Sequence, residues 1–417
     1  MSDGANDGEK RREEIAELIV AGDDRKAFAA LREAIGWPNG KSLPPSELPV
    51  WVALLGTLIR PRDEQVGVVV DAVVRDPDSP DRLYELGYAL IDLGAPGIAA
   101  TVLWRCLALV GDSEEVVCEL VSALESALAY ADAYAILHEH AALRERSFLC
   151  RYLYGFNAAM SGDLAVARAV APSLAPDSPE TTAMQTTLVD LVARANLVAP
   201  TDAADLRGWH YVLTGGLLAH ISPYGLDEPM HGRYAWLADS LPRIATGIAA
   251  LEPLLATFAV PCIYAPSGRD NEILATAISI RTGLPIAPWP AVGVPAPGLV
   301  VAYDLAAIPS AQATQLVNRR TDQLLFVHAT PWTTDCPVAA DVTTLLYQIL
   351  VAPWAETPET PVAVLAAELA ASPVLADDER ADDAQAWARL VERVWPFSPG
   401  VRSRMWAGGP VTSNRFT

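Results

Sequence analysis

The sequence predicts a multidomain α plus α/β protein, in which an α-helical repeat solenoid precedes an α/β domain with a mostly parallel sheet. Its 417 residues suffice for two or three domains of about 100–200 residues each. In residues 1–199, Ala, Leu and Val recur at three- and four-residue spacing, which is typical of helices. In residues 200–417, short apolar runs alternate with helical stretches, an order that favours a parallel sheet. We place the domain boundary at residues 199–202, which contain a proline and an aspartate.

A thirty-four-residue repeat organises the first domain. Residues 83–103 hold apolar and small residues at spacings that fit a pair of helices, and the pattern recurs thirty-four and sixty-eight residues later. Three alanines keep this register, at Ala99, Ala133 and Ala167. The spacing predicts stacked helix pairs, with an ordinary bundle of equally long helices as the alternative. Residues 11–37 are expected to add one more pair as an N-terminal cap.

Over roughly residues 49–179 this pattern resembles the tetratricopeptide repeat. In that family, small residues let the two helices of a unit approach closely, and a late proline such as Pro179 ends the second helix. Most copies here lack the family's aromatic residue at the start of the unit, and Arg151 occupies a position expected to be apolar. The resemblance implies a concave face that binds a protein or peptide partner.

The second domain is expected to open with a β-hairpin over residues 209–221, turning at Gly215 and Gly216. Residues 234–258 follow as a helical region broken near Pro242. The remaining elements alternate. We expect strands at 260–265, 299–303 and 324–329, helices at 271–281, 310–319, 342–351, 362–371 and 382–395, and a loop-like end at 400–417.

Ligands of parallel α/β sheets bind beyond the carboxyl ends of the strands, so the loops there hold the candidate site. After the first strand, Ser267 and Gly268 can present backbone N–H groups to an anion at a helix N-terminus, and Arg269 adds further donors. The same loop can instead be a helix cap, in which Ser267 or Asp270 satisfies the unpaired N–H groups.

The next two strands end in further polar residues. Asp304 follows the second strand, and His328 and Thr330 lie at the end of the third. Asp304 and His328 can form an acid–base pair at neighbouring strand ends, or His328 can be a buried structural donor. We assign no catalytic residue.

These loops also resemble those of type I phosphoribosyltransferases, over about residues 259–330. Residues 299–304 supply the family's apolar strand with one of its two acids, because Tyr303 stands where the first acid belongs. Residues 305–310 replace the family's Thr/Gly-rich phosphate loop. The resemblance implies a phosphoribosyltransferase-like fold without inherited activity, that is, a pseudo-enzyme.

Composition excludes several classes of protein and partner. The chain has 30 basic and 51 acidic residues and a net charge of −21, which repels nucleic acid. No apolar run reaches the roughly 18 residues that a membrane helix needs, and the polar residues 1–14 are unlike a secretory signal. We therefore expect a cytoplasmic protein with neither a nucleic-acid nor a membrane partner.

The cysteine spacing and the absence of two catalytic motifs exclude further classes of protein. The five cysteines are scattered and form no CxxC pair, which argues against a disulfide framework or a zinc site and favours a reducing compartment. No P-loop motif and no GxSxG motif occurs. We expect no metal and no other cofactor.

These observations favour a protein-interaction scaffold or adaptor with a non-catalytic α/β module. One alternative is an enzyme or sensor that binds a phosphorylated or nucleotide-like small molecule at the α/β domain. Another is a structural subunit of a larger complex. The candidate ligand-binding residues of the first alternative are Ser267, Gly268, Arg269, Asp270, Asp304, His328 and Thr330.

Overall fold

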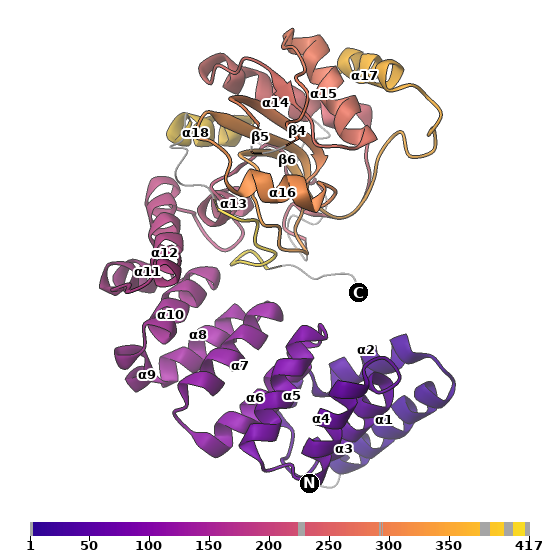
Figure 1. Cartoon of the computed structure of the whole chain (residues 1–417), viewed down its shortest axis with the longest axis vertical. Helices are drawn as coiled ribbons and strands as arrows, with labels where there is room; N and C mark the ends of the chain where they lie inside the picture. The colour runs from indigo at the N-terminus through magenta and orange to yellow at the C-terminus, as the bar shows by residue number, and fades with distance from the viewer. Residues whose placement is uncertain are drawn as a thin grey trace. The chain divides into compact units, whose positions relative to one another are not determined.

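The computed structural model describes residues 3–223, 230–291, 293, 295–375, 384–395 and 403–412. The chain divides into two compact units, Met1–Gln185 and Thr186–Thr417. The division falls inside α12 (Pro179–Val198), and residues 199–202 directly follow that helix. The expected fold class is confirmed, because a helical unit precedes an α/β unit with a parallel sheet (Figure 1).

The first unit is built from helix pairs that follow one another in a curved row (Figure 1). The expected N-terminal pair is present, and the three central first helices begin thirty-four residues apart, at residues 80, 114 and 148. The pairs are α1 (Asp3–Val20) with α2 (Asp24–Ile35), α3 (Leu48–Ile59) with α4 (Glu64–Arg75), α5 (Pro80–Asp92) with α6 (Pro96–Val110), α7 (Glu114–Ser126) with α8 (Tyr130–Glu139), and α10 (Phe148–Met160) with α11 (Leu164–Val170). Two short helices, η1 (Asn39–Ser42) and α9 (Ala141–Arg146), lie between pairs, and a third, η2 (Ala171–Ser173), follows the last pair.

Small residues allow the helices of a pair to pack closely. Ala99, Ala133 and Ala167 lie in the second helices of three successive pairs, and all three are completely buried. On α5, a Cβ added at Gly87 would lie 2.4 Å from Cγ of Leu103 on α6. The absence of a side chain at Gly87 therefore sets how closely α5 and α6 approach.

Side-chain caps fix where many of these helices begin. In each case a Ser or Asp side chain accepts a hydrogen bond from the backbone N–H three residues later, which satisfies one unpaired donor of the helix. The capping residues are Asp23 before α2, Asp63 before α4, Ser113 before α7, Ser147 before α10 and Asp163 before α11.

The second unit contains one sheet in which all the described strand pairs are parallel. The strand order is β1-β6-β5-β4-β3, and β2 also pairs with β6. Two short strands thus share one edge of β6, since β1 pairs with its start and β2 with its end. The strands are β1 (Leu217–Leu218), β2 (Tyr234–Ala238), β3 (Ile263–Tyr264), β4 (Gly298–Asp304), β5 (Gln323–Pro331) and β6 (Val342–Val351).

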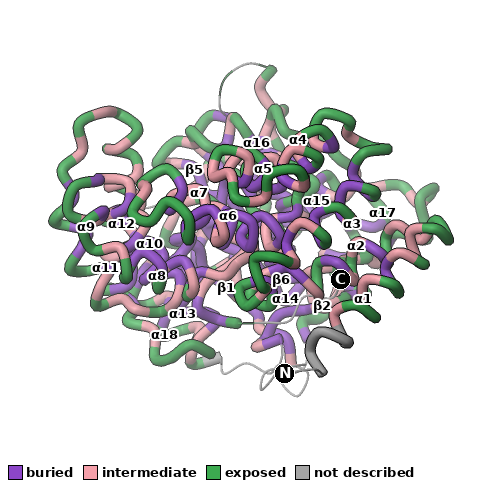
Figure 2. Tube along the Cα trace, turned by 90° about the horizontal axis from the view of Figure 1, so that it is seen from below, coloured by how far each residue is buried: buried purple, intermediate pink, exposed green. Residues whose placement is uncertain are grey.

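Helices cover both faces of this sheet, so its central strands are buried. Figure 1 shows α14 and α15 on one side of the strands and α16 on the other. All nine residues of β5 are buried, and Figure 2 traces buried residues in purple. The helices are α13 (Leu206–Thr214), α14 (Leu241–Thr257), α15 (Arg269–Thr282), α16 (Ser310–Val317), α17 (Val362–Ala371) and α18 (Ala384–Val394).

The expected hairpin at residues 209–221 is wrong. Residues 209–214 of that segment belong to α13, whose C-cap Gly215 has the left-handed conformation, with φ 78°. The chain then enters β1, which pairs in parallel with β6. A Gly-Gly pair fits a helix C-cap as well as a hairpin turn, because both require positive φ.

The helix expected at residues 342–351 is also wrong, because this segment is β6, an inner strand of the sheet. Its first six residues are buried, and β-branched residues such as Val342, Thr343 and Thr344 favour a strand. The region 234–258 likewise begins with a strand, β2, and Pro242 lies in the first turn of α14 instead of breaking a helix.

The other expected elements are confirmed where the structure describes them. Strands β3, β4 and β5 lie in or overlap the expected segments, and α15, α16 and α17 match the helices expected there. Residues 384–394 of the last expected helix form α18, whereas residues 382 and 383 lie outside the described residues.

Replacing Gly87 by alanine tests the close packing of the first unit. The new Cβ meets the buried Leu103 side chain, so G87A should lower the free energy of unfolding by about 1–3 kcal/mol, measured by urea denaturation. Gly97 on α6 is the control, because a Cβ there makes only ordinary contacts at 3.6 Å or more. If G87A and G97A unfold at the same urea concentration, the close approach at Gly87 is wrong.

Candidate functional site

The loop between β3 and α15, together with the first turn of α15, contains four of the candidate residues. Gly268 has φ 138°, a conformation that favours glycine. The backbone N–H of Ser267 donates to Oε1 of Gln312 at 2.9 Å. Nη2 of Arg269 donates to the carbonyl oxygens of Thr357 and Thr360 at 3.0 and 2.8 Å. The loop is therefore tied by these donors to two other segments of the same unit.

Asp270 is tied to the unit in a similar way. Its Oδ1 accepts a hydrogen bond of 2.6 Å from the indole Nε1 of Trp354. The loop lies at the same edge of the sheet as Asp304, since β3 and β4 are parallel neighbours, the loop follows β3, and Asp304 is the last residue of β4. An anion site there, like the resemblance to phosphoribosyltransferases, stays a prediction.

Asp304 ends β4 and accepts two hydrogen bonds through Oδ1. The hydroxyl of Tyr347 donates at 2.6 Å, and the backbone N–H of Ala306 donates at 2.9 Å. Burial raises the pKa of Asp304 above its ordinary value, although the hydrogen bond from Tyr347 acts in the opposite direction. Burial, followed by the charge of Asp304, raises the pKa of Tyr347.

His328 has a different carboxylate as its partner. Its Nε2 lies 2.9 Å from Oδ2 of Asp239, and both side chains are completely buried. Nδ1 of His328 has no hydrogen-bond partner among the described residues. Thr330, also buried, forms a hydroxyl–hydroxyl hydrogen bond of 2.9 Å with Thr343 of β6.

Asp239 directly follows β2 and receives four donors. The backbone N–H of Ser240 and Nη1 of Arg243 lie 2.8 and 3.3 Å from Oδ1. Nε2 of His328 and the hydroxyl of Tyr303 both lie 2.9 Å from Oδ2. These contacts join the end of β2 to α14, β4 and β5.

This environment favours an ionised Asp239. Burial alone would raise its pKa, but the charge and hydrogen bond of His328 and the hydrogen bonds of Ser240 and Tyr303 outweigh burial, so the pKa lies below its ordinary value. The Tyr303 ring also stacks on His328, with centroids 5.4 Å apart. Because the Asp239 and His328 side chains are wholly buried, we interpret the cluster as a buried structural network.

Sequence reasoning missed Asp239. The segment around it was expected to be one helical region, which hid the strand end that places this carboxylate beside β4 and β5. A Ser-Leu-Pro sequence directly after Asp239 was the available signal, since serine at the N-cap and proline in the first turn mark the start of a helix.

Neither a metal-ligand cluster nor a membrane-spanning helix occurs among the described residues. They contain no group of three or more His, Cys, Asp or Glu side chains placed to hold a metal ion. None of the described helices is both long enough and apolar enough to cross a membrane.

In the helical unit, the strongest chemical feature is negative charge on α5 and α7. Residues 80–126 contain eight acidic residues, two arginines and no lysine. Both arginines are paired with acids that precede α5. Arg82 lies 3.2 Å from Asp76, and Arg105 lies 2.6 Å from Asp78. The excess acids therefore have no basic partner within this segment.

Two tyrosines accompany these acids. Helices α5 and α7 contact each other, and the thirty-four-residue repeat places Glu85 of α5 and Glu119 of α7 at equivalent positions. Burial, followed by the charges of Glu119 and Glu115, raises the pKa of Tyr84, so these side chains are close together. Burial and the charge of Asp92 raise the pKa of Glu119. We call this the acidic surface, comprising Tyr84, Glu85, Tyr88, Asp92, Glu115 and Glu119.

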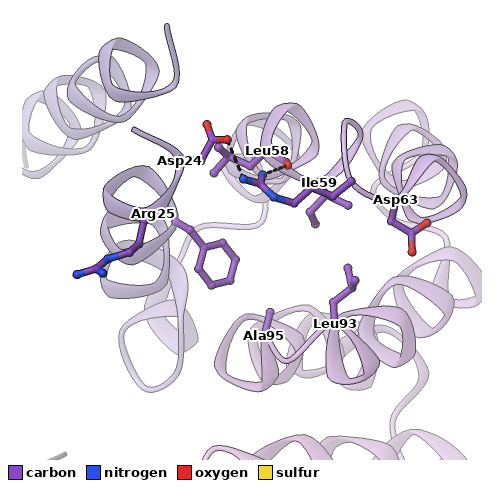
Figure 3. A pocket seen from close by; sticks show the side chains of 9 residues that line it. Asp24, Arg25, Leu58, Ile59, Asp63, Leu93 and Ala95 are labelled. Carbon is purple, nitrogen blue, oxygen red and sulfur yellow. Dashed lines mark hydrogen bonds and ion pairs between the residues drawn. The ribbon is translucent and has the colours of Figure 1, made fainter. Parts of the chain in front are cut away.

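An apolar pocket lies at the end of α5, next to the acidic surface in sequence. Its volume is about 310 Å³, and Figure 3 shows Leu93 and Ile59 pointing toward each other across it. Nη2 of Arg62 binds Asp24 at 2.8 Å on one rim. The lining residues are Asp24, Arg25, Phe28, Leu58, Ile59, Arg62, Asp63, Leu93 and Ala95.

No protein-family model matches the chain, and no curated protein matches it.

Changing Asp239 to Asn tests the buried network. An amide has one accepting oxygen, so two of the four donors would face its NH2 group. D239N should lose about 3–5 kcal/mol of unfolding free energy at pH 7, the cost of breaking a buried ion pair. The exposed Asp322, which pairs with Arg320, supplies the control, and D322N should change stability by less than about 1 kcal/mol. Equal losses in the two variants would contradict the network.

The stability difference between wild type and D239N should also depend on pH. The pKa of Asp239 is lower in the folded state than in the unfolded state. Ionised Asp239 therefore stabilises the fold fully above its unfolded-state pKa of about 3.9, and this stabilisation is lost as the pH falls through the folded-state pKa. The difference in stability between the wild type and D239N should therefore shrink below about pH 4. Urea denaturation at several pH values measures it, and a difference that grows in acid would reverse the sign of the pKa shift.

Proposed function

We propose that this chain is a protein-interaction scaffold whose helical unit binds a basic, partly apolar segment of a partner protein. The observation that carries the proposal is the acidic surface on α5 and α7, which has four acids, while the two arginines of residues 80–126 pair with Asp76 and Asp78 outside it. In this proposal the α/β unit is a second module without catalysis.

The charge of this surface suits a partner rich in Lys and Arg. Clustered acids of one sign attract a cationic segment, speed its encounter and disfavour acidic competitors. Tyr84 and Tyr88 lie on α5 among the acids, and 54% of Tyr88 is exposed. Tyrosine rings add contact area and interact with cationic groups through their faces.

The adjoining pocket adds an apolar contact. Asp92, at the end of the acidic surface, directly precedes Leu93 of the pocket lining, and 41% of Leu93 is exposed. A basic segment that carries an apolar side chain would satisfy both features. The resemblance to the tetratricopeptide repeat supports the same reading, because stacked helix pairs of that kind offer extended binding faces.

A phosphorylated ligand at the carboxyl edge of the sheet has less support. The N–H of Ser267 and Nη2 of Arg269, the donors that would hold such an anion, already bind Gln312, Thr357 and Thr360 within the unit. We therefore place the binding function on the helical unit.

Peptide binding to the full chain tests the proposal. Fluorescence anisotropy compares a labelled peptide of alternating Lys, Leu and Arg with the same peptide carrying Glu in place of its basic residues. Wild type should bind the basic peptide, and the E115Q/E119Q variant should bind it roughly threefold to tenfold more weakly, given up to about 1 kcal/mol per exposed ion pair. Binding should also weaken as salt is added.

A matched control keeps the same change in net charge. Glu139 and Glu145 are exposed acids of α8 and α9 outside the acidic surface, so E139Q/E145Q should bind the basic peptide like wild type. Equal weakening in both double variants would mean that peptide binding depends only on the net charge of the chain. Absence of binding of the basic peptide by the wild type would contradict the proposal.

A further inference from the structure

Two cysteines of the helical unit lie side by side. Cys118 on α7 and Cys150 on α10 are 32 residues apart, and their sulfur atoms are 3.6 Å apart. Cys150 is completely buried, whereas Cys118 is partly exposed. The stacking of one first helix on the next brings these thiols together, since α7 contacts α10.

The start of α10 is held firmly beside α7. Ser147 caps α10 by accepting a hydrogen bond of 3.1 Å from the backbone N–H of Cys150. The Ser147 hydroxyl in turn donates to Oε1 of Glu114, the first residue of α7, at 2.6 Å. Cys150 is therefore fixed in the first turn of a helix, where the helix dipole favours a thiolate.

The two thiols share a hydrogen bond that makes one of them more acidic. The hydrogen bond from Cys118 is the main cause that lowers the pKa of Cys150 to about 7, against the effect of burial, and Ser147 contributes in the same direction. The same hydrogen bond raises the pKa of Cys118. One proton between two sulfurs leaves a thiolate available near neutral pH.

The other three cysteines have different surroundings. The sulfurs of Cys106, Cys262 and Cys336 each contact a backbone carbonyl oxygen. Burial raises the pKa of Cys106 and of Cys336 to about 11, as expected of cysteines that pack as small apolar residues.

We propose that Cys118 and Cys150 form a redox-active pair, which a hydroperoxide oxidises to an intramolecular disulfide that joins α7 to α10. The sulfurs must approach each other by about 1.5 Å to reach the length of a disulfide bond. The inference rests on the two thiols alone, so it holds or fails independently of peptide binding.

The chemistry balances in two steps. The Cys150 thiolate acts as a base and removes the proton of Cys118, and the sulfur of the partly exposed Cys118 then attacks the hydroperoxide. An S–O bond forms, the O–O bond breaks, and the alkoxide or hydroxide that leaves takes a proton from solvent. Cys150 then attacks the sulfenic acid on Cys118, so that an S–S bond forms, the S–O bond breaks and water leaves. The two sulfurs supply the two electrons that reduce the peroxide.

Thiol counting on the full chain tests the proposal. Reduced protein is treated with hydrogen peroxide, denatured, labelled with a maleimide and weighed by mass spectrometry. Wild type should lose two of its five reactive thiols, and unlabelled protein should lose about 2 Da, the mass of two hydrogens. Peptide mapping should identify a Cys118–Cys150 link, and dithiothreitol should restore all five thiols.

Serine variants complete the test. C118S and C150S should each keep all four remaining thiols under the same treatment, because neither retains the pair. C262S is the matched control, since Cys262 is also partly exposed, and it should still lose two thiols. The proposal is overturned if wild type keeps five thiols, if the link involves another cysteine, or if only sulfinic acid forms. Because labelling follows denaturation, buried and exposed thiols are counted alike.

Discussion

Close packing between the two helices of each pair is the constraint on which the helical unit depends. Gly87 has no room for a side chain against Leu103, and Ala99, Ala133 and Ala167 are buried at equivalent positions of successive pairs. Pairs that pack this closely can stack at a constant interval of thirty-four residues. The stacking places α5 against α7 and α7 against α10, so the acidic surface and the paired cysteines both follow from it.

The α/β unit is organised around a buried carboxylate. Asp239 accepts hydrogen bonds or ion pairs from four groups, which come from α14 and its cap, β4 and β5. Buried charge is costly unless it is paired, and here the pairing is complete. This edge of the sheet has the polar residues of a ligand site, yet most of them hold strands, loops and helices together.

The two units therefore differ in where their polar chemistry lies. In the α/β unit, His328 and Tyr303 bind the carboxylate of Asp239 inside the core. On α5 and α7 of the helical unit, the acids outnumber the bases and Tyr88 is half exposed. Exposed charge of one sign acts on other molecules, whereas buried paired charge acts on the fold. This difference is why we assign partner binding to the helical unit.

The sequence by itself determined the order of the two units, the thirty-four-residue repeat, strands such as β4 and β5, and helices such as α15 and α17, because periodicity records which side of an element is buried. Only the tertiary structure decided that residues 342–351 form a strand and that Gly215 ends a helix, since a short apolar run and a Gly-Gly pair each fit two local structures. Which side chains meet was also beyond the sequence. His328 with Asp239, and Cys118 with Cys150, are separated by many residues and come together only when strands and helices take their places.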